Sequence, residues 1–175
     1  MRVVAGRAGG LRLQAPRHGR LRPTSERVRE ALFASLGSLG AVEGATVLDL
    51  FAGTGALGIE ALSRGAASAV FVDSDPAAVD AIRANLASTG LADGVEVVCE
   101  DAATFLTRST RQYDVVLADP PYDFTGWVGI APLLRGALLV VEARGPVDLG
   151  EGWQVVRTRR YGDTAVTLAR AVRRA

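Results

Sequence analysis

The chain has 175 residues, of which 49% are hydrophobic, so it can bury the core of one globular domain. Its single cysteine, Cys99, excludes an internal disulfide bond and a metal site built from several cysteines. No apolar run approaches the roughly 18 residues of a membrane-spanning helix, and the first residues lack the apolar core of a signal peptide. These features predict a cytoplasmic protein that binds no membrane and no metal.

The net charge of +1 conceals a strong segregation of charge along the chain. All 20 basic residues are arginines. Six of them precede the first acid, Glu26, and six more lie in residues 151–175 beside only two acids. The segment between holds 8 arginines and 17 acids. Basic ends predict an anionic partner and an acidic centre predicts a cationic ligand, although solvated surface charge is the simpler alternative for both ends.

Residues 1–23 have the composition of a basic arm that precedes the main domain, residues 24–175. In the arm, Val3-Val4 and 11–13 can pair across Gly9-Gly10 as a small β-hairpin. Thr24 can cap a helix that begins in the next segment, SERVREALFASL. Every fourth residue of this segment is apolar, which predicts one buried stripe, formed by Val28, Leu32 and Leu36.

Five apolar runs then alternate with segments long enough to form helices. These runs predict strands over residues 46–50, 69–73, 95–99, 114–118 and 137–142. They are apolar on both faces, as in a parallel sheet that helices cover on both sides. The last two predicted strands, 153–160 and 163–171, flank a short turn and form an antiparallel hairpin at one edge. The fold class is therefore α/β.

A glycine-rich loop follows the first of these strands. The sequence DLFAGTGALGIEAL places Gly53, Gly55 and Gly58 between a strand and a helix, and Asp73 ends the next strand about 20 residues later. A carboxylate in that position accepts hydrogen bonds from the hydroxyl groups of a ribose. The pattern predicts a site for a nucleotide cofactor, whereas glycines that serve only a tight turn are the alternative.

Four aspartates decide between the two cofactors that use this geometry. The carboxyl ends of adjacent parallel strands face one crevice, so we expect their side chains to meet there: Asp49, Asp73, Asp101 and Asp119. Four carboxylates would repel the pyrophosphate of a nicotinamide dinucleotide. They would attract the sulfonium and ammonium groups of S-adenosylmethionine, each opposite-charge pair contributing about 1 to 4 kcal/mol. S-adenosylmethionine is therefore the predicted cofactor.

The sequence DPPY ends the fourth parallel strand. Asp119 and the carbonyl group of Pro120 can accept the two N–H bonds of an exocyclic amine on a nucleobase. Pro120 and Pro121 fix the backbone and bring no competing N–H donor. Tyr122 offers a flat face for the base, worth about 1 to 3 kcal/mol of stacking. The motif predicts methylation of a planar amine, and a rigid turn without function is the alternative.

The segments RPTSERVREALF, DLFAGTGALGIEALSRGA, DPPY and YGDT occur in this order, and with them the chain resembles the RsmD family. Members of this family are bacterial enzymes that methylate N2 of one guanine in 16S rRNA, the RNA of the small ribosomal subunit. The resemblance implies a Rossmann-like class I methyltransferase domain with a seven-stranded sheet and an amino-terminal β-hairpin extension. The segment ARGPVDLGEG departs from the family pattern, because its glycine and proline content suggests that the last helix is reduced.

The resemblance also implies which residues form the site. Cofactor contacts are expected at Asp49, Phe51, Gly53, Thr54, Gly55, Asp73, Ser74, Asp101 and Ala102. Catalytic contacts with guanine are expected at Asp119, Pro120, Pro121 and Tyr122. The expected RNA contacts of the arm are Arg2, Arg7, Arg12, Arg20 and Arg22.

Three other functions remain open at this point. DPPY also serves methylation of adenine N6 in DNA or RNA. The fold also suits an RNA-binding assembly factor without catalysis, although the complete glycine loop and Asp119 argue against it. A dehydrogenase would use the same loop, but the carboxylates disfavour it. Cys99, in an apolar strand, is expected to serve core packing.

Overall fold

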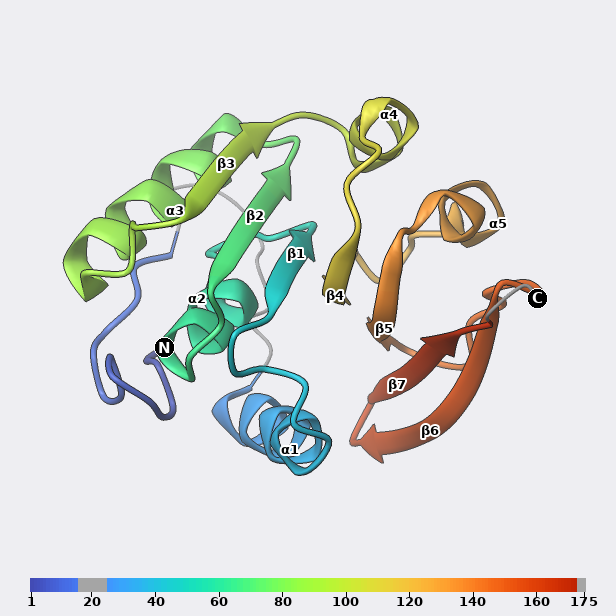
Figure 1. Ribbon diagram of the computed structural model, residues 1–175, viewed down its shortest axis with the longest axis horizontal. Coiled ribbons are helices and arrows are strands. Elements are labelled where there is room, and N and C mark those ends of the chain that lie inside the picture. Colours follow the sequence, from blue (N-terminus) through green and yellow to red (C-terminus); the bar gives the residue numbers. More distant parts are fainter. Residues whose placement is uncertain (16–24, 173–175) are drawn as a thin grey trace.

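The computed structural model describes residues 1–15 and 25–172. Seven strands form one sheet in the order β3-β2-β1-β4-β5-β7-β6 (Figure 1). Their bounds are β1 (Thr46–Leu50), β2 (Ser68–Asp73), β3 (Val95–Cys99), β4 (Tyr113–Ala118), β5 (Gly136–Ala143), β6 (Trp153–Tyr161) and β7 (Thr164–Ala171). Strands β1 to β5 are parallel, and β7 pairs antiparallel with β5 and β6. The predicted mostly parallel sheet with a carboxy-terminal antiparallel hairpin is confirmed.

Helices cover both faces of the sheet. They are α1 (Glu26–Ser38), α2 (Ala56–Ser63), α3 (Pro76–Thr89), α4 (Ala102–Arg108) and α5 (Trp127–Ile130), which continues into a 3-10 turn over Ala131–Leu133. Buried residues of α1, α2 and α3 share one hydrophobic cluster, and those of α4 and α5 share another. The two groups of helices therefore lie on opposite faces of the sheet.

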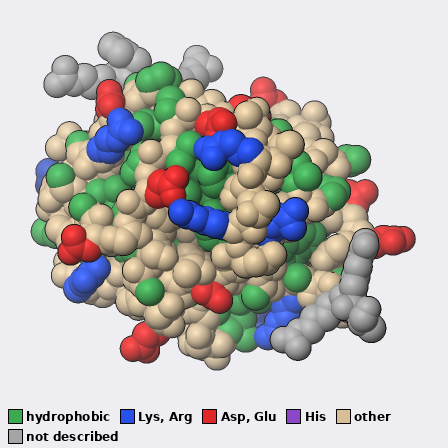
Figure 2. Space-filling view, turned by 45° about the horizontal axis from the view of Figure 1, so that its top comes forward, with side chains coloured by type: hydrophobic (Ala, Val, Ile, Leu, Met, Phe, Trp, Pro, Cys, Tyr) green, Lys and Arg blue, Asp and Glu red, His purple; other side chains and the backbone are tan. Residues whose placement is uncertain are grey.

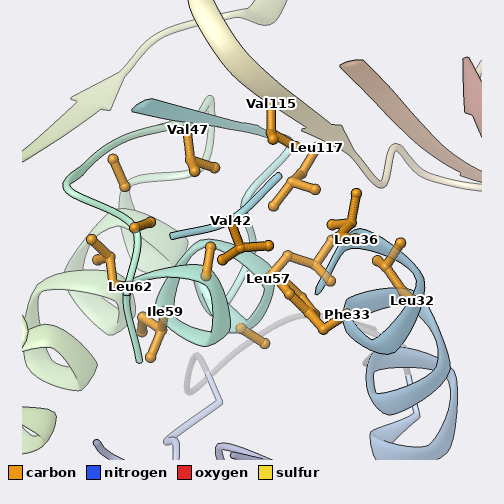
Figure 3. Close-up of a cluster of buried hydrophobic side chains, with 14 of the residues drawn as sticks. Leu32, Phe33, Leu36, Val42, Val47, Leu57, Ile59, Leu62, Val115 and Leu117 are labelled. Atoms are coloured by element: carbon orange, nitrogen blue, oxygen red, sulfur yellow. The ribbon is translucent and has the colours of Figure 1, made fainter. Parts of the chain in front are cut away.

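Successive side chains of the central strands point alternately into the two hydrophobic clusters. Val115 and Leu117 of β4 belong to the cluster on the side of α1, where Leu36 of that helix lies close by (Figure 3). Val116, between them in sequence, belongs to the cluster on the opposite face and is completely buried. Each such side chain contributes about 1.5 to 3 kcal/mol when it leaves water. Burial on both faces explains why this strand reads as a continuous apolar run.

Helix α1 begins one residue later than expected. Ser25, not Thr24, is its N-cap, because the Ser25 hydroxyl accepts a hydrogen bond from the backbone N–H of Val28 at 3.2 Å. Thr24 itself lies outside the described residues. The predicted buried stripe of α1 is confirmed.

Cys99 is exposed, so the expectation that it packs in the core is wrong. It ends β3, which is an edge strand with a partner on one side only. No residue of β3 is fully buried, although Val95 and Val97 pack partly against the cluster that includes α3.

The segment that connects β5 to β6 contains no helix. Residues 144–152, all of them described, form bends and a turn, as its glycines and proline suggested. A shallow hollow lies between α1 and the hairpin of β6 and β7. Arg157 and Arg159 line it, which gives two of the carboxy-terminal arginines a defined location.

The first residues of the arm form an antiparallel pair. Arg2 and Arg12 make a β-bridge, and the backbone N–H of Val3 donates to the carbonyl group of Leu11 at 2.9 Å. Val3, Ala8 and Leu13 are buried in the same cluster as α1 and α2. The arm thus packs on the domain as part of its core. The boundary predicted near residue 23 falls in the part of the chain that is not described and stays a prediction.

Candidate active site

The glycine loop connects β1 to α2 through three left-handed residues. Phe51, Gly53 and Gly55 have φ values of 58°, 57° and 76°. Phe51 is the one residue other than glycine with positive φ within residues 1–15 and 25–172. A side chain in this conformation costs about 1 to 3 kcal/mol and is retained mainly at functional sites. The third glycine serves packing, since a Cβ atom on Gly58 would lie 2.3 Å from the Phe71 ring.

Asp49 is a buried carboxyl group below this loop. Only 1% of it is exposed, and its Oδ2 atom accepts a hydrogen bond from the backbone N–H of Gly58 at 2.8 Å. Burial raises the pKa of Asp49 well above its ordinary value, the Gly58 N–H opposes this, and the charges of Asp119 and Asp73 raise the pKa further. Three of the four predicted aspartates are therefore close enough to interact. A cation among them would relieve the repulsion.

Asp73 fastens the glycine loop to the end of β2. Its Oδ2 atom accepts a hydrogen bond from the backbone N–H of Gly53 at 2.7 Å, and Oδ1 accepts one from Asp75 at 2.9 Å. Ser74, the next residue, is exposed at the same edge. The carboxylate predicted to bind a ribose is thus held rigidly beside the loop.

Asp101 lies at the carboxyl end of β3 but has a structural task. Its Oδ1 atom accepts a hydrogen bond from the backbone N–H of Thr104 at 3.1 Å, which caps α4. Ala102 is the first residue of that helix and is buried. Asp101 is not among the groups that raise the pKa of Asp49. Of the four carboxylates, it is the one least integrated with the others.

The DPPY segment follows β4 directly, at the same edge of the sheet. Asp119 is partly buried, Pro120 is buried, and the carbonyl group of Pro121 accepts a hydrogen bond from Phe124 at 2.9 Å, which closes a turn. The Tyr122 hydroxyl group lies 3.0 Å from the Thr164 hydroxyl of β7. The ring of Tyr122 also has a partner, because the guanidinium carbon of Arg144 lies 4.7 Å from its centroid. Arg144 therefore covers one face of the Tyr122 ring.

Aromatic rings join the glycine loop to the DPPY segment. The ring centroids of Phe51 and Phe124 lie 5.1 Å apart, and those of Phe124 and Trp127 lie 5.3 Å apart in a T-shaped pair. The structure thus explains the strained backbone of Phe51, whose ring braces the two loops against each other. Phe124 was not a predicted site residue, and its only sequence signal is its position two residues after DPPY.

Three polar side chains that the sequence reasoning missed hold the arm on the domain. Glu60 of α2 is completely buried and accepts hydrogen bonds from the backbone N–H groups of Val4 at 2.7 Å and Ala5 at 3.0 Å. The Ser63 hydroxyl accepts one from Ala8 at 3.0 Å. Asn85 of α3 is the third, described below. An acid within the otherwise apolar helix ALGIEALS was the signal available for Glu60.

Of the predicted RNA-binding arginines, Arg2, Arg7 and Arg12 are exposed, and Arg2 and Arg12 lie side by side as the two partners of the β-bridge. The Nε atom of Arg2 also lies 3.6 Å from a carboxylate oxygen of Glu26. Arg20 and Arg22 lie outside the described residues. Figure 2 shows basic and acidic side chains interspersed with apolar ones on one face of the molecule.

Among the described residues, no cluster of His, Cys, Asp and Glu side chains is arranged to hold a metal ion. No helix of the described chain has both the length and the apolar character needed to span a bilayer.

Comparison with known proteins places the chain in a family. A family model described as "Conserved hypothetical protein 95" matches residues 1–170. Ribosomal RNA small subunit methyltransferase D of Escherichia coli K12 is 34% identical over 96% of this chain and 88% of its own length. Putative rRNA methyltransferase YlbH of Bacillus subtilis is 38% identical over 96% of this chain and 97% of its own length.

The fold agrees with this assignment. The solved structure of putative methyltransferase yhhF from Escherichia coli superposes with a TM-score of 0.86 and 32% identity, covering 98% of this chain and 97% of that one. The match therefore extends from the arm to the last hairpin. The chain belongs to the RsmD family of methyltransferases.

Proposed function

We propose that this protein transfers a methyl group from S-adenosylmethionine to the exocyclic N2 atom of one guanine in 16S rRNA. The observation that carries the proposal is the meeting of two loops at one edge of the sheet. The glycine loop after β1 and the DPPY segment after β4 are joined there by the Phe51–Phe124 ring contact. Asp49, Asp73 and Asp119 interact at the same place. The names of the relatives support an rRNA substrate.

The residues at this edge fit the cofactor. S-adenosylmethionine supplies a methyl group bound to a positively charged sulfur atom. The buried carboxyl group of Asp49, whose pKa is raised partly by its acidic neighbours, is the environment in which a cationic ligand is favoured. Asp73 would bind the ribose hydroxyl groups, and the backbone of residues 53–55 would line the rest of the cofactor site. Asp101 and Ala102 would lie against the adenine.

The catalytic task of the DPPY segment is to hold the amine of the base. The Asp119 carboxylate and the Pro120 carbonyl group accept the two N–H bonds of the exocyclic nitrogen, which leaves its lone pair directed at the methyl group. The lone pair of this nitrogen is then no longer shared with the ring and lies in line with the methyl group, so positioning contributes to the rate. The nitrogen becomes acidic once it is methylated, and Asp119 then accepts the proton. Tyr122 stacks on the base, which must leave any helical stack to reach the site.

The RNA partner is expected to contact the arm. Arg7 and Arg12 are exposed on a segment that Glu60 and Ser63 hold against α2. We expect the substrate in the cell to be the small ribosomal subunit or an assembly intermediate in the cytoplasm, because a looped target suits a short arm. Arg2, Arg20 and Arg22 belong to the same proposal.

One experiment tests the reaction and the base together. Small ribosomal subunits that lack the modification are incubated with the protein and S-adenosylmethionine, and the RNA is digested and analysed by mass spectrometry. We expect N2-methylguanosine, formed about 100-fold to 1,000-fold more slowly by the Asp119→Ala variant. N6-methyladenosine would assign the enzyme to adenine. Binding of the subunits without any transfer would favour an assembly factor without catalysis.

A further inference from the structure

We propose that Arg144 binds a phosphate group of the RNA strand that carries the target base. The inference rests on the proposed function and adds a binding contact to it. Arg144 directly follows β5, so it lies at the same edge of the sheet as the DPPY segment. It is exposed, and no motif in the sequence singles it out.

The location of Arg144 is set by Tyr122. Its guanidinium carbon lies over the Tyr122 ring, 4.7 Å from the centroid, which is within the range of a cation–π contact. The Tyr122 hydroxyl group is in turn 3.0 Å from that of Thr164. The ring is thus held between the end of β5 and the start of β7. The positive charge of Arg144, which lies over this ring, is therefore next to the place where a base would stack.

The backbone of Arg144 is also held. The Nη2 atom of Arg160 in β6 donates a hydrogen bond to the Arg144 carbonyl oxygen at 3.2 Å. Arg160 therefore places a second positive charge beside Arg144. Arg144 follows β5 and Arg160 belongs to β6, so the positive charge there depends on the folded sheet.

The guanidinium group of Arg144 has donors left for an anion. Across residues 1–15 and 25–172, no carboxylate lies within ion-pair distance of it. A guanidinium group presents its N–H donors in a planar fork that matches two oxygens of a phosphate. The contact with Tyr122 holds this group 4.7 Å from the ring centroid.

A positive charge is needed here because the same edge of the sheet is acidic. Asp49, Asp73 and Asp119 favour a cationic cofactor but repel the phosphates of an RNA strand that must reach Asp119. An opposite charge a few ångströms from a phosphate offsets about 1 kcal/mol in water and more where water is excluded. Arg144 lies beside Tyr122, the residue after the two prolines that follow Asp119, where it can offset this repulsion.

The test measures RNA binding by the full-length protein as the salt concentration changes. The probe is deproteinised 16S rRNA that lacks the modification. For Arg144→Ala we expect the log–log slope of affinity against salt to fall by about 0.7 to 0.9, as expected when one phosphate contact is removed. The KM for RNA should rise about tenfold, whereas the affinity for S-adenosylhomocysteine should not change. Arg144→Lys should keep the slope because it keeps the charge.

Arg135→Ala is the matched control. Arg135 is also exposed and precedes β5, so it lies at the opposite edge of the sheet, and its replacement should leave the slope unchanged. If Arg144→Ala lowers kcat but keeps the wild-type slope, Arg144 only braces Tyr122 and the inference is wrong. If circular dichroism shows that Arg144→Ala has lost secondary structure, the salt dependence of RNA binding is measured on Arg144→Gln instead, with the same expected result.

Failure of the proposed function would look different. In that case the wild-type protein binds the RNA but transfers no methyl group to it. The salt dependence of binding by Arg144→Ala still decides the inference then, because binding requires no transfer. Transfer with wild-type efficiency by Arg144→Ala, at an unaltered slope, would leave the function standing and remove Arg144 from it.

Discussion

The side-chain amide of Asn85 donates a hydrogen bond to the carbonyl oxygen of Thr54, at 2.9 Å, from the middle of α3 to the centre of the glycine loop. The same amide donates to the carbonyl oxygen of Gln14 at 3.0 Å, and its Oδ1 atom accepts from the Gln14 backbone N–H at 2.7 Å. Asn85 is completely buried. One side chain thus joins the arm, which is expected to bind RNA, to the loop that is expected to bind the cofactor.

Replacing Asn85 by alanine should destabilise the protein and release the arm locally. The change removes the Asn85 partner of the buried Thr54 carbonyl group, which costs about 1 to 3 kcal/mol, and two hydrogen bonds to the part-buried backbone of Gln14. We expect the free energy of unfolding to fall by roughly 3 kcal/mol in urea denaturation. Amide hydrogen exchange should accelerate in residues 1–14 more than in the central strands.

Ser88→Ala is the control for this change. Ser88 is exposed on the same helix and donates to the carbonyl oxygen of Asn85, at 3.1 Å. It should leave exchange in the arm unaltered. Equal protection of residues 1–14 in wild type and Asn85→Ala would show that the buried amide does not hold the arm.

Asp119→Ala should lower turnover severely and keep cofactor binding. The carboxylate is expected to orient the amine in the transition state, and removal of such an interaction typically lowers kcat by about 100-fold to 1,000-fold. Since Asp73 and the glycine loop remain, the affinity for S-adenosylhomocysteine should stay within a few-fold, measured by calorimetry. A large drop in cofactor affinity would mean that Asp119 belongs to the cofactor site.

Asp73→Ala should do the reverse. It removes the proposed ribose contact and the acceptor that holds Gly53 at 2.7 Å. A hydrogen bond to a charged group is worth about 1.5 to 3 kcal/mol, so we expect cofactor affinity to fall by about 10-fold to 100-fold. Asp75→Ala removes the N-cap of α3 instead, where Asp75 accepts from Ala77 at 2.9 Å. That control should lower stability by about 1 kcal/mol and spare the affinity.

The strands and the order of the loops were predictable because local patterns encode them. Val115 to Leu117, for example, are buried on both faces of a central strand and therefore read as an apolar run. Cys99 lies in a similar run but is exposed, since the order of the strands, not the local pattern, makes β3 an edge. The spacing of the motifs likewise predicted that Asp49, Asp73 and Asp119 lie at one edge of the sheet.

The contacts that only the fold creates were not predictable. Glu60 and Asn85 bind the backbone of the arm, 55 and 71 positions away in sequence. Every residue type has a backbone, so the sequence of the arm gives no signal for these contacts. Arg144 meets Tyr122 only because β5 lies beside β4 in the sheet. Such residues look like ordinary surface or helix positions until the sheet order is known.

Replacing the exposed arm arginines should weaken RNA binding and flatten its salt dependence. Removing one phosphate interaction lowers the log–log slope by about 0.7 to 0.9, so Arg7→Ala with Arg12→Ala should lower it by about 1.4 to 1.8. Affinity for S-adenosylhomocysteine should not change. Arg83→Ala is the control, because Arg83 is exposed on α3 and lies 3.8 Å from Asp80. An unaltered slope in the double variant would show that these arginines are solvated surface charges that do not contact the RNA.

The buried carboxyl group of Asp49 should make both stability and cofactor binding depend on pH. Because its pKa is raised in the folded protein, the folded state keeps a proton that the unfolded chain releases above about pH 4. The contribution of Asp49 to stability therefore falls as the pH rises from there to the raised pKa. Asp49→Asn can still accept the Gly58 N–H, so its free energy of unfolding should decline less over this range in urea titrations.

Cofactor binding should show the opposite trend, because a cationic ligand favours the ionised form of Asp49. Affinity for S-adenosylmethionine should rise with pH through the same range, by at most about tenfold per pH unit for one proton. S-adenosylhomocysteine lacks the sulfonium charge and should show a weaker dependence. Calorimetry of both ligands with wild type and Asp49→Asn separates the effects, since the variant should lose the difference between them. An equal pH dependence in both proteins would place the titrating group elsewhere and remove Asp49 from the cofactor site.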